Sequence, residues 1–460
     1  MTATSHLAIK KPEASESKRI QLTSPILHIG SEVSRLNPFE YVQTSKSVYL
    51  PDREALAKAL KEKKKLQEYI RRIEDREEIT SLLKDAFGDD WQTQKFDGEL
   101  IFPKTGINRK WTDETITDLR PMIRNGFGER YIPGSSIKGA IRTAIAYHLL
   151  KYADRYQVTP DLTVSEIEQK LRDKFKSLEE KRQQDIGEGK PPRDKKFQDK
   201  DKKELAKNLF MKKLFSDFAL KYEDNPIGST NEQTNDFMRA IKVTDSKPLI
   251  QRPVKTKNGR TKLVNIPVVT KVIVSSFANF RTKEGFIDKL AKYKAPIYAE
   301  MVSEVWTEFT ITLDTKMLSW FHHNERILPF KTVEDILNIC KEFARDQWEY
   351  ERQYWQGIRN NSNEDIDFDL LREEFYARSE CPYSLRIGWG SGMTGTTIDL
   401  LLDPKLRAEI RDACGLEAPG YEAPKSRRTV VDNSGEIKFA PGWVTFRPRK
   451  KDVQDTNFTT

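Results

Sequence analysis

The chain has 460 residues, with 79 Lys and Arg against 70 Asp and Glu, which gives a formal net charge of +9. No stretch approaches the roughly 18 to 20 uncharged apolar residues of a membrane helix, and the first residues lack the basic and apolar regions of a secretory signal, so we expect neither a membrane protein nor a secreted one. The three cysteines share no short spacing and there are five histidines, a composition that fits the reducing cytoplasm and predicts no disulfide framework, metal site or cofactor.

The basic surplus is spread among many acidic residues, so it permits a nucleic-acid groove without requiring one. At about 150 residues per domain, the length suggests two or three domains. Segments with the period of strands alternate with segments with the period of helices, which predicts a mixed α+β chain.

The first predicted strand covers residues 19–30, where apolar residues alternate with polar ones. Pro25 inside this run indicates an edge strand, a bulge or a break. A hairpin is expected at residues 41–50. A helix is then expected to start after Asp52, which can cap it, and to continue to Ile73 along an apolar stripe.

The next helix is predicted to start after a proline–glycine turn in the string IPGSSIKGAIR, residues 132–142. The hydroxyl of Ser135 or Ser136 is expected to cap it. Free amide groups at a helix start attract anions, and Lys138 and Arg142 lie one turn apart on the same face. The segment is therefore a candidate phosphate-binding site, with a capped amphipathic helix and solvated cations as the alternative.

The composition changes after residue 160. Residues 171–210 carry 22 charged side chains among 40, a poor basis for a core, and they include the helix-breaking string GEGKPP. We interpret residues 161–225 as an inserted, charged helical excursion with a flexible middle.

The rest of the chain is predicted to contain several strands and one long helix. Residues 236–246 look like a strand or the approach to a strand, and enrichment in β-branched and aromatic residues predicts strands at residues 263–279 and 305–315. Helical spacing of apolar residues predicts the helix over residues 332–354.

A glycine-rich segment near the C-terminal end is the feature of the sequence that most specifically indicates a binding site. Its glycines are Gly388, Gly390, Gly392 and Gly395, and Arg386 precedes them. Glycines allow positive φ angles and a close approach of backbones, and exposed amides can hold phosphates. The spacing matches no nucleotide-binding fingerprint, so a glycine-rich turn between two strands is the alternative.

Three residues are candidates for acid–base chemistry: His28 at the end of the first strand, and Asp236 and Asp245, which flank a predicted strand. None has a partner at motif spacing, and a single carboxylate is more often a helix cap or an ion-pair partner. We therefore expect no catalytic residue.

Three segments together resemble the RAMP superfamily of CRISPR effector subunits, and their order and separation match it as well. They are SPILHIG at residues 24–30, IPGSSIKGAIR at residues 132–142 and RIGWGSG at residues 386–392. Within the superfamily, DFMRAIKVTDS at residues 236–246 and the PKSRR and PGW segments of the tail look like the Csm-type subunit that caps the 3′ end of the guide RNA.

The resemblance implies a ferredoxin-like (RRM-like) RAMP core, in one or two such halves, with helical insertions. It divides the chain into an N-terminal ferredoxin-like region (19–160), the charged helical insertion (161–225) and a C-terminal RAMP region with the glycine-rich loop (226–450). The implied function is non-catalytic guide-RNA (crRNA) binding, as a structural subunit of a cytoplasmic type III CRISPR interference complex in antiviral defence. The resemblance does not distinguish a type III-A complex from a type III-D complex.

The resemblance also implies partners and contact residues. The partners are guide RNA, target RNA, RAMP-type backbone subunits and the large signature subunit. The implied RNA-binding residues are Ser135, Ser136, Lys138, Arg142, Arg386, Gly388, Gly390, Ser391, Gly392 and Gly395. The alternative is a RAMP-type endoribonuclease, which would cut target RNA or process guide RNA with one of His28, Asp236 and Asp245.

Overall fold

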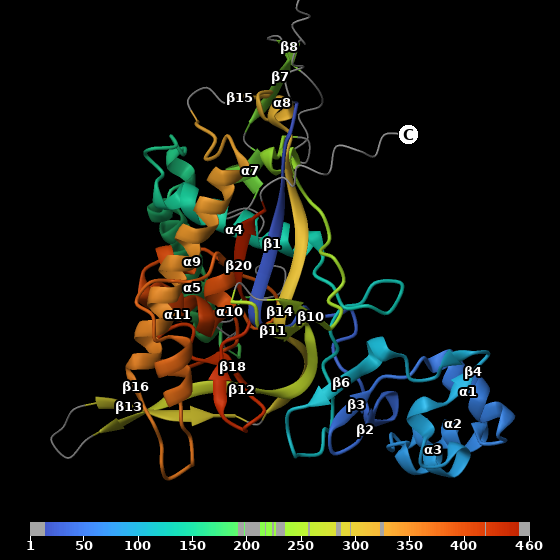
Figure 1. Ribbon diagram of the computed structural model, residues 1–460. Helices are drawn as coiled ribbons and strands as arrows, with labels where there is room; N and C mark the ends of the chain where they lie inside the picture. Colours follow the sequence, from blue (N-terminus) through green and yellow to red (C-terminus); the bar gives the residue numbers. More distant parts are fainter. Residues whose placement is uncertain are drawn as a thin grey trace, which may run out of the picture.

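A large mixed sheet forms the centre of the computed structural model, with the strand order β17-β20-β1-β14-β12-β6-β3-β2 (Figure 1). The structure describes residues 14–191, 197, 212–216, 218–222, 225–226, 235–255, 258–281, 287–294, 296–322, 326–418 and 420–449. The strands along this order are β1 (Glu16–Leu27), β2 (Val42–Gln43), β3 (Ser47–Tyr49), β6 (Ile107–Lys110), β12 (Ile266–Arg281), β14 (Ile297–Leu313), β17 (Leu385–Arg386) and β20 (Trp443–Pro448).

Further strands extend this sheet or form small hairpins. Those that join the large sheet are β9 (Ile241–Val243), β13 (Ile287–Tyr293), β16 (Ile358–Arg359), β18 (Arg427–Val431) and β19 (Ile437–Phe439). Those in separate small sheets are β4 (Lys95–Phe96), β5 (Glu99–Leu100), β7 (Ala219–Tyr222), β8 (Asn225–Pro226), β10 (Arg252–Lys255), β11 (Thr261–Val264) and β15 (Phe321–His322). The predicted hairpin at residues 41–50 is confirmed as β2 and β3.

The centre of the sheet has the topology of a ferredoxin-like fold. The strands β20, β1, β14 and β12 are neighbours in that order, and each adjacent pair is antiparallel. Helix α4 (Gly134–Lys151) follows β1, and helix α9 (Val333–Gln356) follows β14. The predicted ferredoxin-like core is therefore confirmed, as one unit within the described residues, because strands from both ends of the chain join the same sheet.

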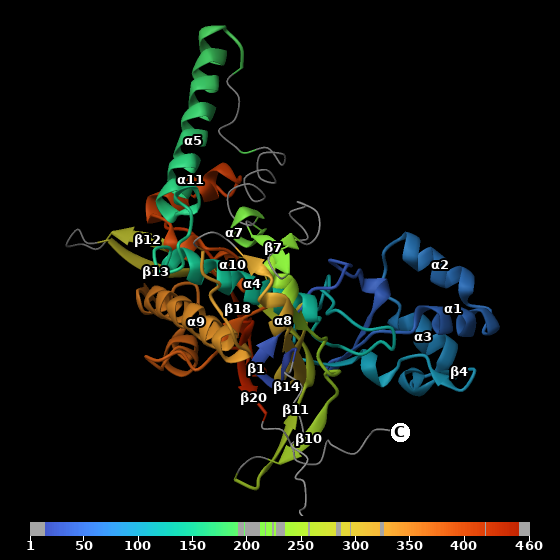
Figure 2. The ribbon, with the colours of Figure 1, turned by 90° about the horizontal axis from the view of Figure 1, so that it is seen from above.

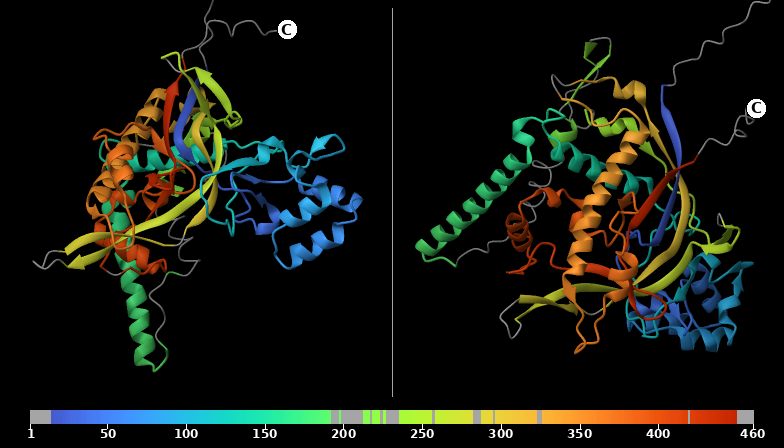
Figure 3. Two further views of the ribbon diagram at one scale, coloured as in Figure 1. Left: turned by 60° about the horizontal axis from the view of Figure 1, so that its bottom comes forward. Right: turned by 60° about the vertical axis from the view of Figure 1, so that its left-hand side comes forward.

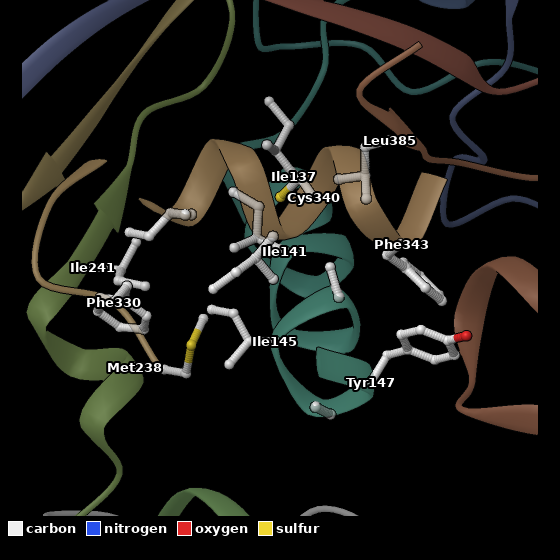
Figure 4. Close-up of a cluster of buried hydrophobic side chains, with 14 of the residues drawn as sticks. Ile137, Ile141, Ile145, Tyr147, Met238, Ile241, Phe330, Cys340, Phe343 and Leu385 are labelled. Atoms are coloured by element: carbon white, nitrogen blue, oxygen red, sulfur yellow. The ribbon is translucent and has the colours of Figure 1, made fainter. Parts of the chain in front are cut away.

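The two helices of this unit share a core (Figure 4). Ile137, Ile141 and Ile145 of α4 and Cys340 and Phe343 of α9 are buried in one hydrophobic cluster with residues of β1 and β14. The apolar faces predicted for both helices are confirmed. Burial of these faces is the main term that holds α4 and α9 on the sheet.

Pro25 leaves one gap in the pairing of β1 with β14, although β1 itself continues unbroken from Glu16 to Leu27. The pairing of β1 with β14 passes from Ser24 to Ile26, and Glu304 of β14 opposite the gap has a φ of +54°. Proline has no N–H to donate to a neighbouring strand, so a break in the ladder is the arrangement that costs no hydrogen bond.

A small helical lobe stands apart from the sheet (Figure 2). Asp52 caps its first helix, since its Oδ1 accepts the N–H of Ala55 at 2.9 Å. The expectation of one helix through Ile73 is wrong, because Lys64 adopts a φ of +59° and turns the chain after one short helix. The helices of the lobe are α1 (Arg53–Glu62), α2 (Leu66–Glu74) and α3 (Thr80–Phe87).

The charged insertion begins with a long helix that projects from the body of the protein (Figure 3). This helix, α5 (Val164–Gly187), buries Ile167 and Leu171 near its start and ends at the predicted helix-breaking string. Its helical character is confirmed. The expected flexible middle lies largely outside the described residues. The other α-helices within the described ranges are α7 (Lys212–Ser216), α8 (Thr315–Leu318), α10 (Gly392–Thr396) and α11 (Pro404–Ala413).

A buried carboxylate fixes the segment of residues 120–130 to the sheet. Glu300 of β14 is fully buried, and it accepts hydrogen bonds from Arg124, from the Nε of Arg130 at 2.7 Å and from the N–H of Met122 at 2.8 Å. Burial raises the pKa of Glu300, but the positive charges of Arg130 and Arg124 outweigh it, and the resulting pKa lies below the usual value. The carboxylate is therefore charged at neutral pH.

The substitution Glu300→Gln should lower the free energy of unfolding by about 3 to 5 kcal/mol, because it leaves the buried Arg130 without a countercharge. Urea denaturation measures this change. Because the pKa of Glu300 is lowered, its stabilising effect is present above the usual glutamate pKa and is lost as the pH falls through the lowered value. The difference between wild type and variant should therefore shrink in acid.

The control for this prediction is Glu304→Gln on the same strand. Glu304 is partly exposed and pairs with the exposed Lys262, so its loss should cost less than about 1 kcal/mol. Equal losses for the two variants would contradict the role assigned to Glu300.

Candidate nucleic-acid interface

The three motif segments meet beside the end of β1. The N–H of Trp389 in the glycine-rich loop donates to the carbonyl oxygen of His28 at 3.0 Å. Ile137, in the first turns of α4, shares a core with Leu385, which lies just before the loop (Figure 4). The neighbouring segments are residues 24–30, 132–142 and 386–392.

Three of the predicted glycines adopt positive φ angles: +78° at Gly388, +100° at Gly390 and +71° at Gly392. A Cβ at Gly388 would lie 2.5 Å from the carbonyl oxygen of His28, and one at Gly390 would lie 2.6 Å from Cγ of Pro441. A Cβ at Gly392 would have no atom within 4 Å. Two of the glycines therefore let the loop pack against the body of the protein, and the third faces open space.

Arg386 and Ser391 support the loop from inside, and each is 2% exposed. The guanidinium of Arg386 donates to the carbonyl oxygens of Pro441 at 3.1 Å and Gly390 at 3.2 Å. A Cβ at Gly395 would lie 2.8 Å from Cβ of Ser391. These side chains shape the loop, and their contact with RNA stays a prediction.

The start of α4 is capped by a distant aspartate. The helix begins at Gly134, whose N–H donates to Oδ1 of Asp245 at 2.7 Å. The expected cap by Ser135 or Ser136 is wrong, because the helix starts before both serines and the chain packs closely there: a Cβ at Gly134 would lie 2.3 Å from the carbonyl oxygen of Val243. Ser135 is exposed and Ser136 is partly exposed, so both remain accessible.

Lys138 and Arg142 lie one turn apart on α4 but differ in their partners. Arg142 forms an ion pair with Asp236 at 2.6 Å, and its guanidinium carbon lies 3.8 Å from the centroid of the Phe215 ring. Lys138 is partly exposed and forms no ion pair within the described part of the chain, and partial burial lowers its pKa. Of the two predicted cations, Lys138 is the one whose charge is not already paired.

The three candidates for acid–base chemistry have structural roles. His28 is fully buried, its Nδ1–H donates to the carbonyl oxygen of Glu300 at 2.6 Å, and burial lowers its pKa to about 4, so the ring is neutral. Asp236 pairs with Arg142, and Asp245 caps α4. The two carboxylates contact different points of α4, and the contacts recorded for the described residues do not join either of them to His28.

Sequence reasoning missed Trp389, which lies in the loop, and Arg120 and Arg428, which contact its ring. The guanidinium carbons of Arg120 and Arg428 lie 4.8 Å and 4.6 Å from the centroid of the Trp389 ring, and His28 packs edge-on against the same ring at 5.2 Å. The position of Trp389 within the glycine run and of Arg428 within PKSRR were usable signals. Nothing near Arg120 in the sequence indicates this location, because the fold alone brings it to the loop.

The described ranges hold neither a candidate metal-ligand cluster nor a helix that could span a membrane. They contain no group of three or more His, Cys, Asp or Glu side chains that could hold a metal ion. They also contain no helix that is long and apolar enough to cross a membrane.

Similar chains occur among solved structures. A chain of a Csm–crRNA–target RNA ternary complex from a type III-A CRISPR–Cas system is similar, with a TM-score of 0.52 and 21% identity over 94% of this chain and 100% of that chain. The Csm5 of T. onnurineus is also similar, with a TM-score of 0.52 and 19% identity over 93% of this chain and 100% of that chain. At these identities the likeness concerns the fold.

A sequence relative and a family model also match this chain. The Csm5 protein of Enterococcus italicus is 27% identical over 168 residues, which cover 31% of this chain and 48% of the relative, so the match spans about half of the relative's length. The family model of the RAMP superfamily matches residues 19–364, which include most of β1 and all of α4 and α9 but end before the glycine-rich loop. Since this match covers about three-quarters of the chain, the protein is a member of the RAMP superfamily.

Proposed function

We propose that this protein is a guide-RNA-binding structural subunit of a type III CRISPR interference complex and caps the side of the complex at the 3′ end of the guide. The observation that carries the proposal is the meeting of the glycine-rich loop, the end of β1 and the start of α4 on one ferredoxin-like core. Backbone amides and a few cations at such a place can follow a sugar-phosphate chain without reading its sequence. A subunit that must hold guides of any sequence needs this kind of contact.

The similar proteins support this assignment and its partners. One similar chain belongs to a complex that contains crRNA and target RNA, and the relatives carry the name Csm5. We extend to this protein the partners guide RNA, target RNA, RAMP-type backbone subunits and the large signature subunit. Because the similar complex is of type III-A, that type is the one we propose.

We also propose the division of the chain into residues 19–160, 161–225 and 226–450. In the structure, β1 of the first region pairs with β14 and β20 of the third. The first and third regions would then act as one RNA-binding unit, and the insertion would project from it.

The position of the guide tests the proposal. In the reconstituted complex, a photoreactive uridine near the 3′ end of the guide RNA should crosslink to this protein, and the same nucleotide near the 5′ end should not. Denaturing gels of the labelled RNA measure the crosslink. Crosslinks to this protein from the 5′ end alone would overturn the 3′ assignment, and no crosslink from either end would overturn guide binding.

The open glycine of the loop gives a second prediction. Gly392→Ala should weaken guide-RNA retention, because the added methyl group would stand where the RNA backbone approaches. Gly98→Ala is the matched control, since Gly98 also has a positive φ (+84°) and open space around it, and it lies in the β4–β5 turn of the helical lobe. Both variants should lose about 1 to 2 kcal/mol of unfolding free energy through backbone strain. Equal retention of RNA by the two variants would argue against contact at Gly392.

The endoribonuclease alternative predicts a different result for the three former candidates. With His28→Gln, Asp236→Asn and Asp245→Asn introduced one at a time, we expect the cleavage products of guide and target RNA to stay unchanged wherever the complex assembles. Each of these side chains is occupied by a structural contact. Loss of one product from an intact complex would favour the nuclease instead, and native gels report the assembly.

A further inference from the structure

We propose that Arg120 and Arg428, which both contact the ring of Trp389, form a binding site for a phosphate group of the RNA backbone. The site rests on the proposed function, because it supplies a contact for the same RNA beside the same loop. It consists of three residues outside the set that the sequence predicts.

Three separate elements hold the site in place. The N–H of Arg120 donates to the carbonyl oxygen of Tyr298 at the start of β14, at 2.9 Å. Arg428 lies in β18 opposite Val274 of β12, and Trp389 is tied to the end of β1 by its N–H. The backbone under each side chain is therefore hydrogen-bonded into the large sheet, and the two guanidinium groups meet at one aromatic ring.

The site carries positive charge without a countercharge. Arg120 and Arg428 form no ion pair with a carboxylate among the described residues, and the Nε of each is buried and has no hydrogen-bond partner there. Burial lowers the pKa of Arg428, and the nearby charges of Arg120 and Arg386 lower it further. Like charges that are held together and partly desolvated are stabilised by an anion that accepts their hydrogen bonds.

Two other buried arginines near these in the chain have carboxylate partners, whereas the nearby Arg386 is held by carbonyl oxygens. Arg427, the residue next to Arg428, pairs with the buried Glu351 at 3.3 Å. Arg130, on the same segment as Arg120, pairs with Glu300 at 2.7 Å. The protein thus supplies a carboxylate to Arg427 and to Arg130, but the described residues supply none to the two guanidinium groups at Trp389.

The chemistry of the site fits a phosphate of a nucleic-acid backbone. Trp389 and both arginines are partly exposed, so a ligand can reach them from solvent. Guanidinium groups match phosphate oxygens with paired N–H donors, and the adjacent glycine-rich loop allows a chain to approach closely. The ring of Trp389 already contacts two guanidinium groups, so we assign it a positioning role.

The test compares two double variants of the full chain. Arg120→Gln with Arg428→Gln removes the site. The control, Arg71→Gln with Lys176→Gln, removes two other positive charges, one from the exposed face of α2 and one from that of α5. Filter binding of single-stranded poly(U) RNA at several salt concentrations is the measurement. We expect the first variant to bind about tenfold more weakly or worse, the factor expected for one lost charge-assisted contact. Its plot of log K against log salt should be shallower by about 0.7 per lost phosphate contact, and the control should bind within about twofold of wild type, because its exposed charges lie outside the site.

A further variant keeps the test decisive if the glutamine variant fails to fold, which thermal melting reports. Arg120→Lys with Arg428→Lys retains both charges but loses the paired donors, so its affinity should fall while its salt slope stays near that of wild type. Wild-type affinity and slope in a folded glutamine variant, wild-type affinity in the lysine variant, or no poly(U) binding by the wild-type chain would overturn the proposal. The guide crosslink would still decide the proposed function, because it reports the position of the RNA end in the complex and does not depend on these arginines.

Discussion

The pairing of the buried Glu300 is the interaction on which the part of this protein around the glycine-rich loop depends. The side chain of Glu300 neutralises Arg124 and Arg130, and its backbone carbonyl accepts the hydrogen bond of His28. A buried charge is tolerated only when it is paired and hydrogen-bonded, so the arginines and the N–H of Met122 are needed around this carboxylate. Glu300 fixes the segment of residues 120–130 and the end of β1 at the same place on the sheet, and the glycine-rich loop then packs on that end.

The use made of each arginine depends on its neighbours in space. Arg386 and Arg142 were the obvious candidates for RNA contacts, yet one supports the loop from inside and the other pairs with Asp236. Arg120 and Arg428 have no carboxylate partner among the described residues, and both contact the ring of Trp389 in the loop. The net charge of +9 gives no hint of this division, because it counts paired and unpaired charges alike.

Much of the fold could be predicted from local patterns. The apolar faces of α4 and α9 and the long strands β12 and β14 follow from periodicity, because a buried face must repeat with the period of its element. Two local predictions were wrong: the single helix through Ile73 and the serine cap of α4. The first was wrong because Lys64 adopts a positive φ, a backbone conformation that is uncommon for residues other than glycine and that the sequence pattern does not indicate. The second was wrong because the cap comes from Asp245, more than a hundred residues away.

The sequence by itself determined the superfamily and the elements of the core, since motif strings and hydrophobic periods are local properties that the amino-acid order carries directly. Tertiary structure alone decided which cations are free to meet a ligand. An ion pair, a buried guanidinium or an unpaired one depends on which distant residues share its surroundings, such as Glu300 for Arg130 and Trp389 for Arg120. Electrostatic interactions act through space, so their outcome is set by the fold and not by neighbours in the chain.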